Sequence, residues 1–134
     1  MSTPTPGDLM DRRHILVADE DPKVVEFIIR TLRQDGHAVF HAYDGSSAVQ
    51  LVYALRKCDL VISNTKIDGV AGIDLIRQLR HDRPAQPIMY IANTGRSTPE
   101  IESRLPADVP IIREPFTAEE LRTMVEKLLD GGGR

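Results

Sequence analysis

Acidic side chains crowd the end of the first apolar segment of the chain. Asp19, Glu20 and Asp21 directly follow residues 14–18, which have the length and apolar character of a buried strand. Three acids therefore crowd one strand end, and they are either part of a site at that end or surface acids without a metal.

A polar residue also ends the central apolar segment. Leu60, Val61 and Ile62 form a run too short for a helix, and Asn64 follows it. Ligands of open α/β sheets bind outside the carboxyl ends of the strands, so Asn64 stands where a nucleophile or ligand is expected. An amide is a poor nucleophile, and the alternative is that Asn64 only forms the turn by bonding its own backbone.

Short apolar segments alternate with amphipathic segments along the rest of the chain. We expect strands at 14–18, 37–42, 60–62, 88–91 and 109–112. We expect helices from 22 to about 35, from Ser46 to Leu55, around 73–79, from about 99 to 105, and after the capping box at 117–120. This order predicts an α/β fold whose parallel sheet carries helices on both faces, with the fifth strand at an edge because of Pro110.

Composition bounds the class of protein. The chain has 134 residues, 41% of them hydrophobic, so we expect one folded domain at 13–130 between flexible segments at 1–12 and 131–134. The 17 basic and 20 acidic residues give a net charge of −3 and form no basic patch, so we expect no nucleic-acid binding by this chain alone. No apolar stretch has the length of a membrane span, and we expect a soluble, cytoplasmic protein. The single cysteine, Cys58, is expected to be a packed thiol.

Four segments resemble the receiver domain of bacterial two-component response regulators. They are residues 15–22, residues 59–72, Pro87-Ile88, and residues 114–116 with the capped helix that follows. The resemblance covers roughly residues 13–130 in order and spacing. It implies a flavodoxin-like doubly wound sheet of five strands in the order 2-1-3-4-5, and a role in signal transduction and phosphorelay.

The resemblance also implies where the working residues of the family should fall. In that family, an aspartate after the third strand accepts a phosphoryl group from a histidine kinase, and two acids hold Mg²⁺. A hydroxyl and a lysine contact the phosphoryl oxygens, and an aromatic residue reports the state. These positions correspond to Asn64 for the acceptor, Asp19 and Glu20 for the metal, Ala92 for the hydroxyl, Glu114 for the lysine and Ile111 for the aromatic residue.

Four working positions therefore lack the required chemistry. An amide oxygen is a much poorer nucleophile than a carboxylate, and Glu114 places negative charge where phosphoryl transfer needs a cation. We expect an atypical, non-enzymatic single-domain response regulator, a pseudo-receiver that acts through protein contacts. One alternative is phosphorylation by a cognate histidine kinase at Asp68, Asp19 or Asp21; another is small-ligand sensing in the altered pocket. Lys66 is either a solvated turn residue or places its ammonium over the acids, where a weakly held metal is the other candidate.

Two surfaces are candidates for partner binding. The first helix is apolar over a wide arc, and since Phe27 and Ile28 match buried positions of the family, we expect Val25 and Ile29 to be exposed unless neighbouring helices cover them. The resemblance implies that a sensor histidine kinase or another response regulator docks there and on residues 114–116, which include Phe116. A homodimer would instead use the fourth helix, fifth strand and fifth helix, with ion pairs drawn from Glu102, Arg104, Arg113, Glu119, Arg122 and Lys127.

Overall fold

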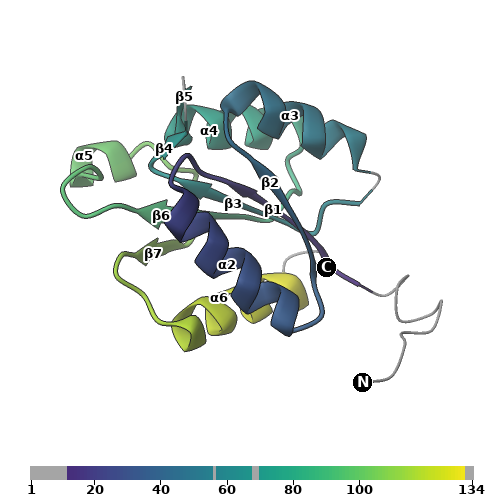
Figure 1. The fold of residues 1–134 in the computed structure, drawn as a ribbon. Coiled ribbons are helices and arrows are strands. Elements are labelled where there is room, and N and C mark those ends of the chain that lie inside the picture. The colour runs from purple at the N-terminus through teal and green to yellow at the C-terminus, as the bar shows by residue number, and fades with distance from the viewer. Residues whose placement is uncertain (1–11, 56, 68–69, 132–134) are drawn as a thin grey trace, which may run out of the picture.

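The computed structural model describes residues 12–55, 57–67 and 70–131, and in these ranges strands alternate with helices (Figure 1). In chain order the elements are β1 (His14–Ala18), α2 (Pro22–Gln34), β2 (Ala38–Ala42), α3 (Gly45–Ala54), β3 (Leu60–Asn64), β4 (Lys66–Ile67), β5 (Val70–Ala71), α4 (Gly72–Asp82), β6 (Ile88–Ala92), α5 (Pro99–Glu102), β7 (Ile111–Arg113) and α6 (Ala118–Gly131). The predicted flexible segments lie outside the described residues except for Arg12 and Gly131. No helix of the described part is long and apolar enough to cross a membrane.

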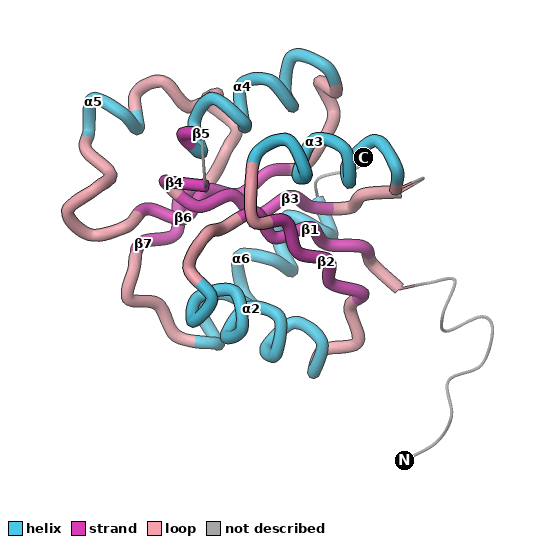
Figure 2. Tube along the Cα trace, turned by 45° about the horizontal axis from the view of Figure 1, so that its top comes forward, coloured by secondary structure: helices cyan, strands magenta, loops and turns pink. Residues whose placement is uncertain are grey.

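Five parallel strands form the main sheet in the order β2-β1-β3-β6-β7. Helices α3 and α4 cover one face, and α2 and α6 cover the other (Figure 2). Strand residues alternate between the two cores, so Leu16 faces α3 and α4 whereas Ile15 and Val17 face α2 and α6. The predicted flavodoxin-like fold, with β7 at an edge, is confirmed.

Local sequence signals set the ends of the helices as expected. The Asp21 side chain accepts a hydrogen bond from the Lys23 N–H, and Pro22 occupies the first turn of α2. The turn after α2 passes through Gly36, whose φ of 90° lies in the region that glycine tolerates best. At α6, Thr117 and Glu120 form the reciprocal bonds of a capping box.

The structure corrects three element boundaries. Helix α5 ends at Glu102 rather than 105, because Arg104 and Leu105 form tighter turns onto Ile101 and Glu102. Strand β7 begins at Ile111 rather than 109, because the Val109 N–H bonds back to Pro106 and the chain is still turning there. The loop expected after β3 contains the antiparallel β4 and β5 pair.

Candidate functional site

Asp19 and Asn64 meet at the carboxyl edge of the sheet. Strands β1 and β3 are neighbours, with Ala18 beside Ser63, so the next residue of each strand lies at the same edge. The Asn64 Nδ2 donates to Asp19 Oδ2 at 2.6 Å, and the Asp21 N–H donates to Asp19 Oδ1 at 2.9 Å. Both side chains are buried, with Asp19 0% and Asn64 2% exposed. The structure thus joins the predicted acceptor position to the first predicted metal position.

Burial dominates the electrostatics of this pair. Loss of solvent raises the pKa of Asp19 to about 6, while the Asp21 N–H and the Asn64 amide stabilise the carboxylate and lower it. The charges of Asp21 and Glu114 push the same pKa upward. Asp19 is therefore a carboxylate that binds protons in the folded state more tightly than in the unfolded chain.

The other end of the Asn64 amide is also occupied. Its Oδ1 accepts the Thr65 N–H at 2.6 Å, which is the turn-forming bond considered as the alternative for this residue. Behind the turn, the Gly72 N–H donates to Thr65 O at 2.9 Å, and a Cβ on Gly72 would stand 1.7 Å from Asn64 O. Close approach of the start of α4 holds this turn, and the Asn64 side chain beside it is almost fully buried.

Glu114 follows β7 and lies at the rim of the same edge. Its Oε2 accepts from Asn93 Nδ2 at 2.8 Å, and its Oε1 is buried without a hydrogen-bond partner in the described part of the chain. Ala92 is 2% exposed and brings no hydroxyl, although its carbonyl accepts the Glu114 N–H at 3.1 Å. Ile111 is half-buried against the core of α3 and α4. Asp19, Asn64 and Glu114 lie close together at this edge, and their side chains are acids and an amide.

The described residues form no ready-made Mg²⁺ site. Asp19 is buried and already accepts one hydrogen bond on each carboxylate oxygen, from the Asn64 amide and from the Asp21 N–H. Glu20 Oε1 lies 3.5 Å from the guanidinium of Arg96. In ranges 12–55, 57–67 and 70–131, no group of three or more His, Cys, Asp or Glu side chains is arranged to hold a metal. The Lys66 side chain and Asp68, which we named as candidates, lie outside what the structure describes.

A chain of hydrogen bonds leaves this edge for the surface, and the sequence analysis missed it. Thr65 Oγ1 accepts from the buried Tyr90 hydroxyl at 3.0 Å, and that hydroxyl lies 2.9 Å from Ser97 Oγ. Ser97 Oγ donates to Glu102 Oε2 at 2.7 Å, and Glu102 pairs with Arg113 through two bonds. The available signal was Tyr90, because a buried tyrosine needs a partner for its hydroxyl.

The predicted exposure of α2 is wrong at two positions. Val25 is 5% exposed, and Phe27, which we expected to be buried, is 36% exposed. Val25, Ile28 and Leu32 share one helical face at spacings of three and four residues and fill the core, so Phe27 points away from it. The Phe27 ring meets Phe116 edge to face, with the centroids 5.9 Å apart. Ile29 is half-buried.

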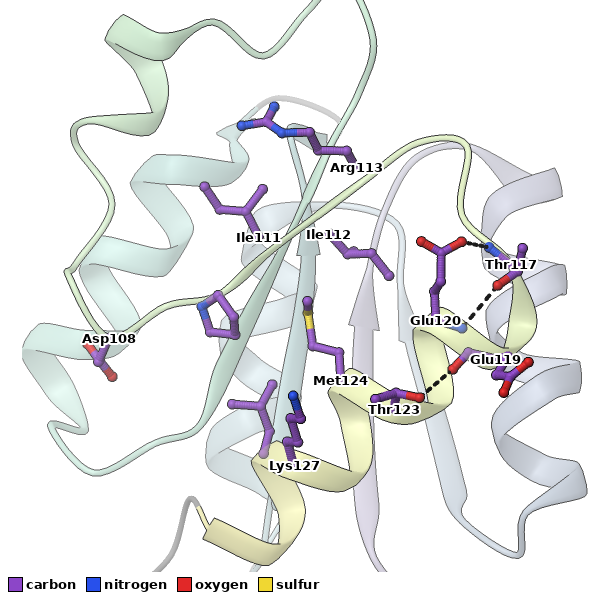
Figure 3. Close-up of a pocket in the computed structure, with 12 residues that line it drawn as sticks. Asp108, Ile111, Ile112, Arg113, Thr117, Glu119, Glu120, Thr123, Met124 and Lys127 are labelled. Atoms are coloured by element: carbon purple, nitrogen blue, oxygen red, sulfur yellow. Dashed lines mark hydrogen bonds between the residues drawn. The ribbon is translucent and has the colours of Figure 1, made fainter.

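The arginines expected to pair across a dimer are largely engaged within the chain. Arg113 binds Glu102, and Arg122 Nε lies 2.9 Å from Asp35 Oδ2. Arg104 is exposed. A hollow of about 740 Å³ lies along β7 and α6, with Ile111, Ile112 and Met124 inside and charged side chains at its rim (Figure 3).

Cys58 is a packed thiol, as predicted. Its Sγ lies 3.6 Å from Leu60 O, and burial raises the pKa of the thiol to about 11.

Comparison with known proteins gives a family. The model of the response regulator receiver domain matches residues 15–126. The DNA-binding response regulator MtrA of Mycolicibacterium smegmatis is 34% identical over 118 residues, which cover 88% of this chain and 51% of MtrA. The probable transcriptional regulatory protein TcrX of Mycobacterium tuberculosis is 26% identical over 115 residues, covering 86% of this chain and 49% of TcrX. The chain therefore spans about half the length of these curated relatives.

Solved structures agree with the same assignment. A response regulator receiver protein from Sinorhizobium medicae superposes with a TM-score of 0.81 at 26% identity, covering 91% of this chain and 98% of that one. The signal receiver domain of a histidine kinase from Syntrophus aciditrophicus gives a TM-score of 0.79 at 27% identity, covering 91% and 93%. The family model spans most of the chain and the sheet order is that of these structures, so the chain belongs to the response regulator receiver domain family of two-component signalling.

Proposed function

We propose that this receiver domain works as a pseudo-receiver, a signalling module that recognises partners without conventional aspartyl phosphorylation. The observation that carries the proposal is the closed hydrogen bonding of Asn64. Its Nδ2 is held by Asp19 and its Oδ1 by the Thr65 N–H, each at 2.6 Å, in a side chain that is 2% exposed. A neutral, buried amide whose two ends are hydrogen-bonded is a much poorer nucleophile toward phosphorus than a carboxylate.

The surroundings of Asn64 oppose phosphoryl transfer as well. Transfer requires cations and donors aimed at the phosphoryl oxygens. Here Glu114 contributes a carboxylate that already raises the pKa of Asp19, and Ala92 contributes no hydroxyl. A dianionic phosphoryl group at this edge would meet two carboxylates and would be repelled.

Incubation with acetyl phosphate and Mg²⁺, followed by intact-mass measurement, tests this proposal. We expect no mass gain for the native chain, and no structural response to beryllofluoride. The matched control is the triple variant Asn64→Asp, Ala92→Thr, Glu114→Lys, which should gain one phosphoryl group, whereas Asn64→Asp alone should gain little. The three changes should act more than additively because they serve one transition state.

A phosphorylated native chain would overturn the proposal. Peptide mapping would then choose among Asp19, Asp21 and Asp68, the acids of the alternative function. Asp21 is exposed, whereas Asp19 is 0% exposed and bonded on both oxygens.

The face that we propose for partner binding surrounds Phe27 and Phe116. A hollow of about 450 Å³ lies there between α2 and the segment after β7, lined by Val24, Phe27, Glu114, Pro115 and Phe116. An aromatic pair that is partly exposed and flanked by Lys23 and Glu114 has the composition of an interface hot spot. We propose a sensor histidine kinase or another response regulator of the cytoplasm as the partner, with no contribution from nucleic acid.

Two charge-introducing variants distinguish this face from a self-pairing face on β7 and α6. Phe27→Asp should abolish association with a cognate kinase and leave the oligomeric state unchanged, with Ile29→Asp as a second probe of the same helix. Arg113→Glu should leave kinase binding intact and alter only self-association. Sedimentation and pull-down measure the two effects, and no change in either would contradict both assignments.

A further inference from the structure

A hollow at the opposite, amino edge of the sheet gathers positive charge. It has a volume of about 400 Å³ and lies between the end of α2, the turn at Gly36 and the start of β2. Arg12, Arg33 and His37 line it together with the ring of Phe40, and no acidic residue of ranges 12–55, 57–67 and 70–131 lines it. Because β1 and β2 are parallel, with His14 beside Ala38, this hollow lies a full strand length away from Asp19 and Asn64.

The two arginines of the hollow differ from most others in the chain. In the described ranges, ion pairs with carboxylates engage Arg13, Arg30, Arg80, Arg96, Arg113 and Arg122. Among the same residues, neither Arg12 nor Arg33 has such a partner.

The acids near the hollow are already engaged elsewhere. Asp59 lies 3.8 Å from Arg13 and 3.7 Å from Lys57, and Asp35 lies 2.9 Å from Arg122. The charges of Asp35, Asp59 and Glu126 reach His37, but no carboxylate of the described residues forms an ion pair with Arg12 or Arg33.

The donors in the hollow are partly fixed in place. Arg33 donates from one terminal nitrogen to Val39 O at 3.0 Å, which anchors the guanidinium over β2 and leaves its other N–H groups for a ligand. Burial lowers the pKa of His37, so its ring is neutral near neutral pH and contributes a hydrogen bond rather than a charge. Phe40 stacks on His14, with ring centroids 6.0 Å apart, and forms a rigid apolar wall.

We propose that this hollow binds the phosphate group of a small organic phosphate. Guanidinium groups present planar, paired donors that match phosphate oxygens, and two of them line this hollow, with no acid among its described lining residues. The volume lies within the range of small-molecule sites, and the Phe40 wall gives a ring system an apolar surface against which to lie. The site is separate from the pocket of the proposed function, so each can fail without the other.

The test is a titration of the whole chain at low salt, followed in amide ¹H–¹⁵N spectra. The probes are adenosine 5′-monophosphate, inorganic phosphate, and adenosine as the uncharged counterpart. We expect saturable shifts at the amides of Gly36, His37 and Ala38 with both phosphates and none with adenosine. Tighter binding of the nucleotide than of inorganic phosphate would indicate that the adenine ring packs against Phe40. Equal binding of the two would indicate that the hollow recognises the phosphate group alone.

Substitutions connect these shifts to the arginines. Arg12→Ala and Arg33→Ala should each weaken binding about tenfold, the scale of one charge-assisted contact. Arg77→Ala is the matched control, because Arg77 is exposed on α4 and has no ion pair in the part of the chain that the structure describes. The affinity of Arg33→Lys should lie between those of the native chain and Arg33→Ala, since lysine keeps the positive charge but lacks the paired, planar N–H donors of guanidinium.

Three results would overturn the proposal. They are the absence of saturable shifts at the three amides, an equal response to adenosine, and a loss in Arg77→Ala as large as in Arg12→Ala. Arg33→Ala also removes the bond to Val39 O and so risks local unfolding. Arg12→Ala decides the question in that case, because Arg12 precedes β1 outside any element.

Discussion

The two edges of the sheet treat their polar side chains in opposite ways. At the carboxyl edge, Asp19, Asn64 and Thr65 are buried and use their hydrogen-bonding groups on one another and on the backbone. At the amino edge, Arg12 and Arg33 are exposed around a hollow and keep most of their donors free. Position in the fold therefore does not by itself make a site. Ligands bind at the carboxyl edge in this fold class, yet here the side chains of that edge have fewer hydrogen-bonding groups left for a ligand than those of the amino edge.

The largest expected effect comes from forcing the carboxyl edge open. Gly72→Ala places a Cβ 1.7 Å from Asn64 O and 2.9 Å from the Asn64 carbonyl carbon, so backbone must move. We expect a loss of about 3 kcal/mol or more in the free energy of unfolding, measured by urea denaturation. Gly131→Ala is the control, since nothing lies within 4 Å of its Cβ. Equal stabilities of the two variants would show that the turn at Asn64 is not tightly held.

Replacing the amide with an acid should come next. Asn64→Asp removes the donor that reaches Asp19 Oδ2 at 2.6 Å and sets two buried carboxyl groups in contact. We expect a loss of roughly 2 kcal/mol near neutral pH, shrinking in mild acid where one of the two groups is protonated. Denaturation at both pH values measures it. A variant as stable as the native chain at neutral pH would mean that the edge tolerates charge and is more open than we describe.

The native chain itself should show a pH dependence of the opposite sign to that of a salt-bridged acid. The pKa of Asp19 is raised from 3.8 to about 6, so the folded state binds more protons than the unfolded state between these values, and stability falls as pH rises through them. We expect on the order of 1 kcal/mol of this loss between about pH 5 and about pH 7.5. Asp19→Asn should flatten the curve in that window. If Asp19→Asn keeps the same slope of stability against pH, a group other than Asp19 causes the pH dependence.

The smallest effect concerns the route from the carboxyl edge to the surface. Tyr90→Phe leaves Thr65 Oγ1 and Ser97 Oγ each without one partner and should cost about 1 kcal/mol in the free energy of unfolding. Tyr43→Phe is the control, because Tyr43 is 59% exposed. Chemical shifts of Arg113 should change in the first variant alone. If they do not, the chain of bonds does not couple the two places.

Sequence patterns predicted the scaffold better than the surfaces, for a physical reason. Buried strands such as β3 show as short apolar runs, here Leu60 to Ile62, and caps such as Asp21 and Thr117 act over two or three residues, so both are local signals. The exposure of Val25 and Phe27 was wrong because α2 is apolar over more than one face, and packing against β1, β2 and α6 decides which face is core. Helical periodicity alone could not show that Val25 is buried and Phe27 is exposed.

The candidate site shows the same limit. Resemblance identified Asp19, Asn64, Ala92 and Glu114 as the residues that meet at one edge, and the structure gathers them. It could not show that both ends of the Asn64 amide are bonded, because that depends on side-chain geometry rather than on residue type. The Arg12 and Arg33 hollow was equally hidden, since the two residues are 21 positions apart and only the turn at Gly36 brings them together.

The path of polar contacts from Ile91 O to Glu102 has one hydroxyl proton fewer than it has contacts. The path has four oxygen-to-oxygen contacts: Ile91 O to Thr65, Thr65 to Tyr90, Tyr90 to Ser97, and Ser97 to Glu102. Both ends are pure acceptors, so the three hydroxyl groups supply three protons for four contacts. One contact is always two lone pairs facing each other. The position of that gap therefore sets the orientation of all three hydroxyl groups, so the orientations at Thr65 in the interior and at Ser97 beside the Glu102–Arg113 pair depend on each other.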